Sequence, residues 1–349
     1  MQLKFVAHSM FLILIIVSFL SAGCAQSIRE SESENNVAIK QVWPPSPLPA
    51  RIQFVTSVSQ PMNLGIKAGW FERLTQLVGG TEEPHFIKPT GVSVEQGVVY
   101  VADPGTQSLW ILDKQASTFE QLFIAGKENL VSPVAVATGK DGRFYLVDSY
   151  LASVFVFSKQ GGFLSTIGEG ILQRPAGIAF DHSADRLYVS DSAAHRISVF
   201  TAEGQPLYHI GQRGAGEGSF NFPTHITIDK KGKVLVTDSL GFRIQSFAPD
   251  GKFLEAFGHH GNATGDFAAP KGVATDSDGH IYVVDSLFDT VQIFNKDGQL
   301  LLSFGERGVD PGQFWLPNGI FIDSNDRIYI ADTYNQRIQI FDYLGRNKQ

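Results

Sequence analysis

The feature that most constrains this chain is a sequence unit that recurs six times. In every unit a proline opens an apolar run and an aspartate closes the next run, at intervals of 42 to 48 residues. The prolines are Pro89, Pro133, Pro175, Pro223, Pro270 and Pro317, and the aspartates are Asp103, Asp148, Asp191, Asp238, Asp285 and Asp332. A regular period of this length predicts a repeat architecture built from one supersecondary unit.

Each unit contains several short runs that are typical of β-strands. Residues 317–345 hold three runs rich in Ile, Phe and Tyr, with Asp, Asn and Gly at the reversals between them. Other units add a fourth run, as at residues 251–258 and 298–305. The 3.6-residue periodicity of a helical solenoid is absent, whereas four antiparallel strands at this spacing are typical of a propeller blade. We therefore predict an all-β, six-bladed β-propeller.

One strand is missing from the sixth unit. A strand-like segment, "ARIQFVTSVSQ" at residues 50–60, precedes the first unit and has no unit of its own. We expect residues 51–58 to complete the last blade and close the ring, which also removes an exposed sheet edge. The predicted propeller then spans residues 51–345, with repeats starting near 87, 131, 173, 221, 268 and 315.

The units resemble NHL repeats. The segment "GSFNFPTHITIDKKGKVLVTDSLGFRIQSFAPDGKFLEAFG" (218–258) has the proline-led strand, the aspartate before the loop and the "RIQ-x-F" strand of that family. The linkers "GQRGAGEGSFNFP", "GHHGNATGDFAAP" and "GERGVDPGQFWLP" align their glycines, phenylalanine and proline. The resemblance covers residues 51–345. It implies the propeller fold and leaves the chemistry open, because similar propellers include binding modules, RNA-binding domains and metal-dependent enzymes.

The start of the chain resembles a bacterial lipoprotein leader. Lys4 precedes the apolar run Met10–Leu20, and "LSAGC" ends in Cys24, the only cysteine. Ser21 stands where the lipobox usually has a bulky aliphatic residue. We predict a signal peptide at residues 1–23, lipid attachment at Cys24 and a flexible, proline-rich tether at residues 24–50. The alternative is an ordinary signal peptide or an uncleaved anchor.

The leader also sets the expected location. The predicted protein is exported and membrane-anchored in the bacterial cell envelope. Ala25 lacks the aspartate that retains some lipoproteins at the inner membrane, which favours the outer membrane facing the periplasm. The formal net charge of −7 and the export signal argue against nucleic acid as a partner.

Antiparallel strand order places the residues after each proline and after each aspartate on the same rim of the ring. An aspartate shared by all six units is expected to orient the following loop through backbone N–H groups, with a six-carboxylate metal site as the alternative. Departures from the repeat are better candidates for function. His225 stands where most units have glycine. The alternative for His225 is a histidine that is simply hydrogen-bonded. Three further candidates for the binding rim directly follow their prolines: Thr90, Lys271 and Asn318.

The loops after the aspartates carry apolar or aromatic side chains in a place where polar residues are expected. We predict that these side chains form a binding rim; packing beneath the neighbouring linkers is the alternative. They are Tyr150, Leu151, Leu240, Leu287, Phe288 and Tyr334. A short amphipathic helix is predicted at residues 69–80, where apolar residues recur at helical spacing before a Gly-Gly stop.

These features support two functional hypotheses. The first is a non-catalytic, lipid-anchored propeller without cofactors that binds a protein, peptide or glycan partner in the cell envelope through one rim. The second is a metal-dependent enzyme like the peptidyl-hydroxyglycine lyase or lactonases of similar propellers, in which His225 and His85 would supply part of a zinc or calcium site. Phosphate-binding loops, HExxH and nucleophile-elbow motifs are absent from the sequence, which favours the first hypothesis.

Overall fold

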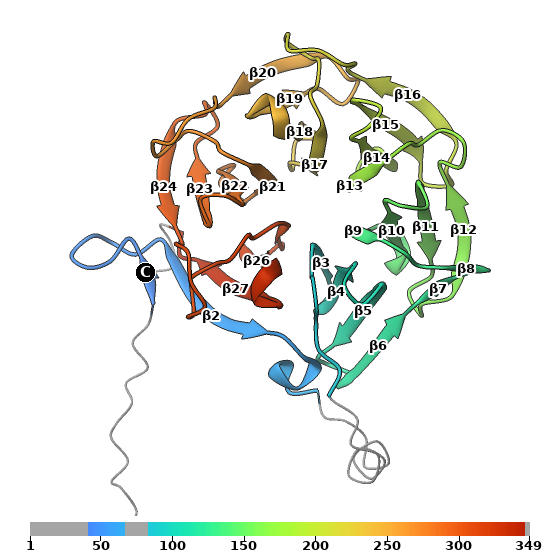
Figure 1. Ribbon diagram of the computed structural model, residues 1–349, viewed down its shortest axis with the longest axis horizontal. Helices are drawn as coiled ribbons and strands as arrows, with labels where there is room; N and C mark the ends of the chain where they lie inside the picture. Colours follow the sequence, from blue (N-terminus) through green and yellow to red (C-terminus); the bar gives the residue numbers. More distant parts are fainter. Residues whose placement is uncertain (1–40, 67–82, 346–349) are drawn as a thin grey trace, which may run out of the picture. The chain divides into compact units, whose positions relative to one another are not determined.

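The structure is a computed structural model that describes residues 41–66 and 83–345. Its strands form six sheets arranged as blades around a common centre, and one separate two-stranded ribbon (Figure 1). The prediction of an all-β, six-bladed propeller is therefore confirmed. Cys24 and the helix predicted at residues 69–80 lie outside the described residues. No helix within the described ranges is long and apolar enough to cross a membrane.

Five blades are formed by four consecutive strands, and the sixth recruits strands from the start of the propeller. Blade 1 contains β3 (Gly91–Glu95), β4 (Val98–Asp103), β5 (Ser108–Asp113) and β6 (Thr118–Leu122); blade 2 contains β9 (Pro133–Thr138), β10 (Phe144–Asp148), β11 (Ser153–Phe157) and β12 (Phe163–Ile167); blade 3 contains β13 (Pro175–Asp181), β14 (Arg186–Asp191), β15 (Arg196–Thr201) and β16 (Pro206–Ile210); blade 4 contains β17 (Pro223–Ile228), β18 (Val234–Asp238), β19 (Arg243–Phe247) and β20 (Phe253–Phe257); blade 5 contains β21 (Pro270–Thr275), β22 (Ile281–Asp285), β23 (Thr290–Phe294) and β24 (Leu300–Phe304); blade 6 contains β25 (Ile320–Ile322), β26 (Arg327–Asp332), β27 (Arg337–Tyr343), β2 (Ile52–Val58) and β1 (Val42–Trp43).

Short elements occupy the connections between these strands. They are the two-stranded ribbon β7 (Ile124–Ala125) and β8 (Glu128–Asn129), and the 3₁₀ turns η1 (Pro61–Leu64), η2 (Lys140–Gly142), η3 (Ser239–Gly241) and η4 (Thr333–Asn335).

The ring is closed inside blade 6, as predicted. Strand β2 pairs antiparallel with β27, from Ile52 opposite Tyr343 to Val58 opposite Ile338. The blue strand β2 and the red strand β27 lie side by side in Figure 1. Because β2 fills the fourth position of blade 6, counted from the centre, the described fold has no incomplete blade.

The predicted tether ends earlier than expected. Within residues 24–50, Val42 and Trp43 form β1, which pairs with β2, and the Trp43 ring lies 5.6 Å from Phe304 and 5.9 Å from Phe341. The prediction of a flexible tether was therefore wrong for these two residues. A large indole that can bury its surface against two phenylalanines holds the backbone in place in spite of the surrounding prolines.

The hydrophobic core lies between neighbouring blades. Six clusters of buried side chains are found, and each takes its members mainly from two adjacent sheets. One cluster, for example, joins Tyr145 and Val147 of blade 2 to Ile178 and Phe180 of blade 3. The third strands β11 and β23 are buried along their whole length, whereas the outer strand β12 is largely exposed. Each blade is thus stabilised by apolar burial against both neighbours.

Hydroxyl groups link consecutive blades at one rim. In blades 4 and 5 the residue after the ring aspartate donates a hydrogen bond to the carbonyl of the next blade's proline, from Ser239 to Pro270 (2.9 Å) and from Ser286 to Pro317. Thr333 donates in the same way to Pro89 of blade 1 (2.8 Å). The seam between the last and first blades therefore uses the same contact as seams between sequence neighbours.

Candidate functional site

In each blade one proline precedes or opens the inner strand and one aspartate closes the second strand. These residues mark one face of the ring, which we call the Pro–Asp rim. In the blades that begin with β9, β13, β17 and β21, the proline that opens the inner strand is paired directly with the aspartate that closes the second strand. The loops after the aspartates and the linkers before the prolines consequently lie together. In these four blades the residues after the proline and those after the aspartate lie at the same end of the sheet.

The six ring aspartates are fully buried and hold the loops of this rim in place. Asp103 accepts hydrogen bonds from the backbone N–H of Gly105 (2.8 Å) in the loop that follows it, and of Ile87 (2.8 Å) and Lys88 (2.9 Å) in the linker before it. Asp148 bonds in the same way to the linker and loop of blade 2. The predicted role in orienting the following loop is confirmed, and the structure extends it to the preceding linker.

Two ring aspartates also pair with an arginine from the third strand. Arg243 Nε lies 2.9 Å from Asp238, and Arg337 Nε lies 2.8 Å from Asp332. Arg196 holds the corresponding place in blade 3, but its guanidinium donates to the carbonyl of Ile171 (3.3 Å) instead. Within the described ranges, no group of three or more His, Cys, Asp or Glu side chains is arranged to hold a metal ion. The ring carboxylates are therefore committed to backbone N–H groups and arginines.

A central channel of about 270 Å³ runs along the inner strands. At the Pro–Asp end the inner strands approach so closely that glycine is needed: a Cβ on Gly177 would come within 2.3 Å of the Thr224 carbonyl, and one on Gly319 within 2.3 Å of the Thr90 carbonyl. His225 lines the channel at the same level. The single imidazole predicted from the repeat thus stands in the narrow mouth of the channel.

His225 is held in an environment that disfavours its charged form. Burial lowers the pKa of His225 to about 3; the Lys271 ammonium also lowers it, and the side chain of Asn318 acts in the opposite direction. The Nδ1 atom of His225 and the neighbouring Thr224 hydroxyl are both buried and have no hydrogen-bond partner in the described structure. The imidazole is therefore neutral at pH 7.

This lowered pKa predicts a pH-dependent contribution to stability. Between about pH 6.5 and pH 3 the unfolded chain binds a proton at His225 that the folded chain does not bind, so stability falls as the pH falls through this window. We expect the free energy of unfolding to decrease more steeply towards acid in the wild type than in His225→Gln, because the amide does not titrate. Denaturant unfolding at several pH values measures both slopes, and equal slopes would contradict the prediction.

The other polar candidates on the rim differ in whether their side chains have hydrogen-bond partners. Thr90 is buried and its hydroxyl donates to the Val134 carbonyl (3.0 Å), so it links two blades. Lys271 is half-buried, and burial lowers its pKa while Asp285 acts in the opposite direction. Asn318 is also half-buried, and its backbone carbonyl accepts from Gly272, which places it beside Lys271. His225, Lys271 and Asn318 therefore form one group, and Thr90 has a structural contact.

The predicted apolar rim is partly exposed. Tyr150 is 75% exposed, Leu287 63%, Tyr334 50% and Leu240 49%. Leu151 and Phe288 are only half-exposed, and Leu151 packs against the core cluster between blades 1 and 2.

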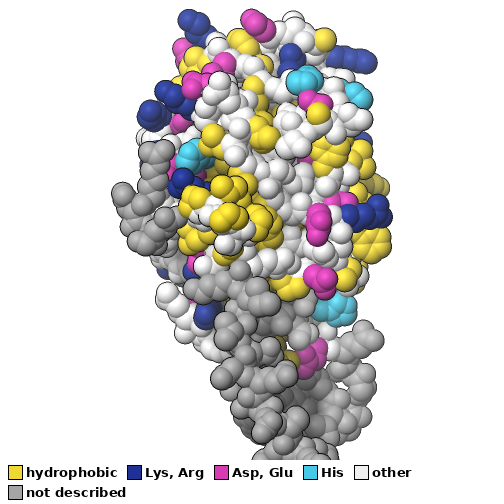
Figure 2. Space-filling view, turned by 90° about the vertical axis from the view of Figure 1, so that its left-hand side faces the viewer, with side chains coloured by type: hydrophobic (Ala, Val, Ile, Leu, Met, Phe, Trp, Pro, Cys, Tyr) yellow, Lys and Arg dark blue, Asp and Glu magenta, His cyan; other side chains and the backbone are white. Residues whose placement is uncertain are grey.

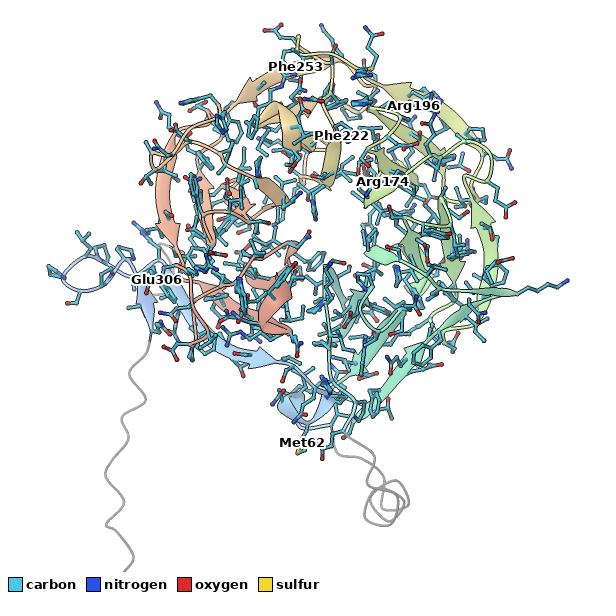
Figure 3. The ribbon with its side chains drawn as sticks, in the orientation of Figure 1. Met62, Arg174, Arg196, Phe222, Phe253 and Glu306 are labelled. Carbon is cyan, nitrogen blue, oxygen red and sulfur yellow. The ribbon has the colours of Figure 1, made fainter. Side chains whose placement is uncertain are left out.

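Sequence reasoning missed several residues of this rim. Trp315, 39% exposed, lies in the linker of blade 6 with its ring 5.6 Å from Tyr334, and together they extend the apolar surface. Arg174 is exposed beside the start of β13, near the centre of the ring, whereas Arg196 lies further out (Figure 3). The position of Arg174 directly before a proline is the signal that could have identified it.

His85 and His225 are not joined in a metal site by the described residues. His85 lies before blade 1, and its Nδ1 is 3.0 Å from the backbone carbonyl of Glu83. Neither histidine belongs to a group of three or more candidate ligands in the described part of the chain. The weak metal candidates of the sequence analysis therefore gain no further ligand.

A larger cavity, of about 750 Å³, lies between blades 5 and 6 and is lined by Arg51, His280, Tyr343 and Leu301 among others. Figure 2 shows hydrophobic side chains gathered on the face that carries the outer strands of these blades. The carboxylates at this cavity are already engaged: Tyr343 donates to Asp278 (3.0 Å), and Ser277 donates to Asp326 (2.7 Å). These bonds tie the two blades together, and they leave the channel mouth as the better candidate site.

Comparison with known proteins supports the same class. The family model DUF5128, described as a 6-bladed beta-propeller, matches residues 175–260 and 272–347. "Protein brain tumor" of Drosophila melanogaster is 29% identical over 137 residues, which is 38% of this chain and 13% of that protein. The chain thus spans a small part of this relative. Fold and comparison together define a six-bladed β-propeller protein with a resemblance to NHL repeats.

Solved structures show the same fold at low identity. A streptogramin B lyase structure matches with a TM-score of 0.56 and 17% identity, over 74% of this chain and 94% of that chain. The virginiamycin B lyase of Staphylococcus aureus gives a TM-score of 0.57 and 14% identity, over 73% and 95%. A nidogen/laminin complex gives 0.53 and 18%, over 72% and 90%. At these identities the likeness concerns the fold alone, since one propeller architecture carries many functions.

Proposed function

We propose that this protein is a lipid-anchored, extracytoplasmic scaffold that binds a protein, peptide or glycan partner through its Pro–Asp rim. The observation that carries the proposal is the set of exposed apolar side chains contributed to this rim by separate blades: Tyr150, Leu240, Leu287 and Tyr334, together with Trp315. Aromatic side chains on a rigid scaffold are typical anchors of binding surfaces. Their spread over several blades favours a protein partner over a small ligand.

The anchor is proposed from the sequence "LSAGC" and is tested separately. Export to the cell envelope and thioether lipidation at Cys24 predict that the protein fractionates with membranes. Substitution Cys24→Ser should abolish labelling with a radioactive fatty acid. Labelling that survives the substitution would contradict lipidation at this residue.

The rim is tested with two triple variants that remove similar apolar area. Tyr150→Ala, Leu287→Ala and Tyr334→Ala together should weaken capture of a partner from envelope extracts at least about tenfold, because each anchor is worth about 1 kcal/mol or more. The control variant carries Leu164→Ala, Leu207→Ala and Leu254→Ala, which remove exposed leucines from the outer strands of blades 2, 3 and 4. Equal capture by both variants would refute the rim as the binding surface.

The enzyme hypothesis makes a distinct prediction. A lyase or lactonase of the kind suggested by the resemblance would need additional metal ligands near His225, and the described residues supply no group of three. Metal analysis of the purified protein decides between the hypotheses: stoichiometric zinc or calcium that is lost in His225→Ala would favour the enzyme.

A further inference from the structure

Lys271 is a partly buried cation at the channel mouth, and Asp285 acts on it electrostatically without forming an ion pair with it. It follows the proline of blade 5, and no hydrogen bond or ion pair of its ammonium group is found within the described residues. The Asp285 carboxylate accepts from the backbone N–H of Ala268 (2.7 Å), Ala269 (3.0 Å) and Leu287 (3.1 Å). Placing an unpaired cation in a partly desolvated position costs stability, and a position of this kind is often reserved for a ligand.

The groups beside Lys271 are also unsatisfied. The Thr224 hydroxyl and His225 Nδ1 are buried without a hydrogen-bond partner in the described structure. Gly272 donates to the Asn318 carbonyl at 3.0 Å, so the inner strands of blades 5 and 6 are in direct contact here. Polar groups that are costly to bury without a hydrogen-bond partner are thus gathered on one side of the mouth, from blades 4, 5 and 6.

The opposite side of the mouth, formed by blades 1, 2 and 3, has no such group of polar side chains without partners among the described residues. At the position of Lys271, blade 1 has Thr90, whose hydroxyl is satisfied by the Val134 carbonyl (3.0 Å), and blades 2 and 3 have Val134 and Ala176. The six-fold repeat therefore does not require a cation or an imidazole at this level. The asymmetry points to a ligand-binding role for the group formed by Thr224, His225, Lys271 and Asn318, which we call the mouth cluster.

We propose that the mouth cluster binds one carboxylate that the partner inserts into the channel mouth; this inference rests on the proposed binding function of the Pro–Asp rim. Lys271 supplies the only formal positive charge of the cluster, because His225 is neutral at pH 7. One positive charge with neutral donors suits a carboxylate better than a phosphate dianion. The exposed cations Lys88 and Arg174 on the same rim add a positive field that attracts an anionic group to the opening.

The carboxylate could belong to an Asp or Glu side chain or to a chain terminus, because both present the same anionic group to the mouth cluster. Three probes distinguish these sources: a capped and amidated peptide with one central aspartate, an amidated peptide without acidic residues, and that same neutral peptide with a free C-terminus. Sodium phosphate, matched with sodium chloride for ionic strength, tests the preference for a carboxylate.

The experiment follows the ring signals of His225 by NMR during titration of the full-length protein with each probe. We expect saturable shifts with the aspartate peptide or with the free C-terminus, and none with the neutral amidated peptide. Lys271→Gln should weaken this binding at least about tenfold, as loss of a charged hydrogen-bond partner does, while Lys271→Arg should retain part of it. Lys231→Gln removes an exposed cation from the β17–β18 turn, at the opposite face of the ring, and should change the affinity less than about twofold.

Stability provides a second, ligand-independent readout. Lys271→Met removes the unpaired ammonium and keeps the aliphatic stem, so we expect the melting temperature to rise by about 2 °C while the carboxylate-dependent shifts disappear. Non-saturable shifts, shifts that persist in Lys271→Gln, or stronger binding of phosphate would each overturn the inference. If Lys271→Gln leaves partner capture intact while the Tyr150/Leu287/Tyr334 variant abolishes it, the mouth cluster is refuted and the binding rim stands.

Discussion

A chain that lacks residues 51–58 is expected to lose cooperative folding of the propeller. Deletion removes β2, whose Ile52 and Val58 are almost completely buried, and leaves β27 as an edge with unpaired backbone groups. The lost apolar burial is worth about 1.5–3 kcal/mol for each of these side chains, and about 1 kcal/mol is lost for each backbone hydrogen bond. The sum is comparable to the whole stability of a typical domain, about 5–15 kcal/mol. Circular dichroism and thermal melting measure the result.

Two point variants test the contribution of β2 to stability without removing the strand. Ile52→Ala should lower the free energy of unfolding by about 2–5 kcal/mol, because it creates a cavity in the cluster between blades 5 and 6. Val55→Ala, in the middle of the same strand but 38% exposed, should cost less than about 1 kcal/mol. A deletion variant that melts at the wild-type temperature, or equal effects of the two point variants, would show that the ring is not closed through β2.

Substitution Asp332→Ala is expected to be the most damaging single change on the Pro–Asp rim. Asp332 accepts from Arg337 Nε (2.8 Å), Gln339 Nε2 (3.0 Å) and the Trp315 backbone (2.8 Å). Its removal leaves the guanidinium, whose side chain is only 12% exposed, without a counter-charge. The expected loss in the free energy of unfolding is about 3–5 kcal/mol, measured by denaturant titration.

The matched control is the exposed ion pair of the same blade. Arg327 and Asp342 are 2.8 Å apart, with side chains 44% and 35% exposed, so Asp342→Ala should cost less than about 1 kcal/mol. Combining Asp332→Ala with Arg337→Met should restore part of the lost stability, because the uncompensated charge is then removed. If Asp332→Ala and Asp342→Ala are equally mild, the ring aspartates do not hold the rim as described.

The fold could be predicted because its determinants repeat. The proline and aspartate of each blade recur at fixed spacing, and the resulting pattern identifies both the strands and the rim. The closing strand at residues 51–58 was predictable by counting, since one blade lacked a strand. Strand β1 was not predictable: Val42 and Trp43 are too few to show a strand period, and their order comes from a contact with Phe304 and Phe341 that is distant in sequence.

The candidate site was predictable only where it breaks the repeat. His225 was identified because glycine is expected at its position, and the close approach of the neighbouring inner strands explains that expectation. Thr224 was missed because a threonine also follows the proline in blade 1, where its hydroxyl is satisfied. The difference between Tyr150, which is exposed, and Leu151, which packs inward, depends on the path of the loop and not on composition.

The pairing of β2 with β27 also determines when folding of the propeller can be completed. Residues 52–58 are synthesised before the first blade, yet their partners, residues 338–343, follow only after the five blades between them. The blades formed by consecutive strands can assemble as the chain emerges, but the sixth sheet cannot form before all five of these blades and β27 have been synthesised. During that interval β2 presents an unpaired strand with apolar side chains. Protection of this early segment is therefore a requirement of biogenesis for a protein of this architecture.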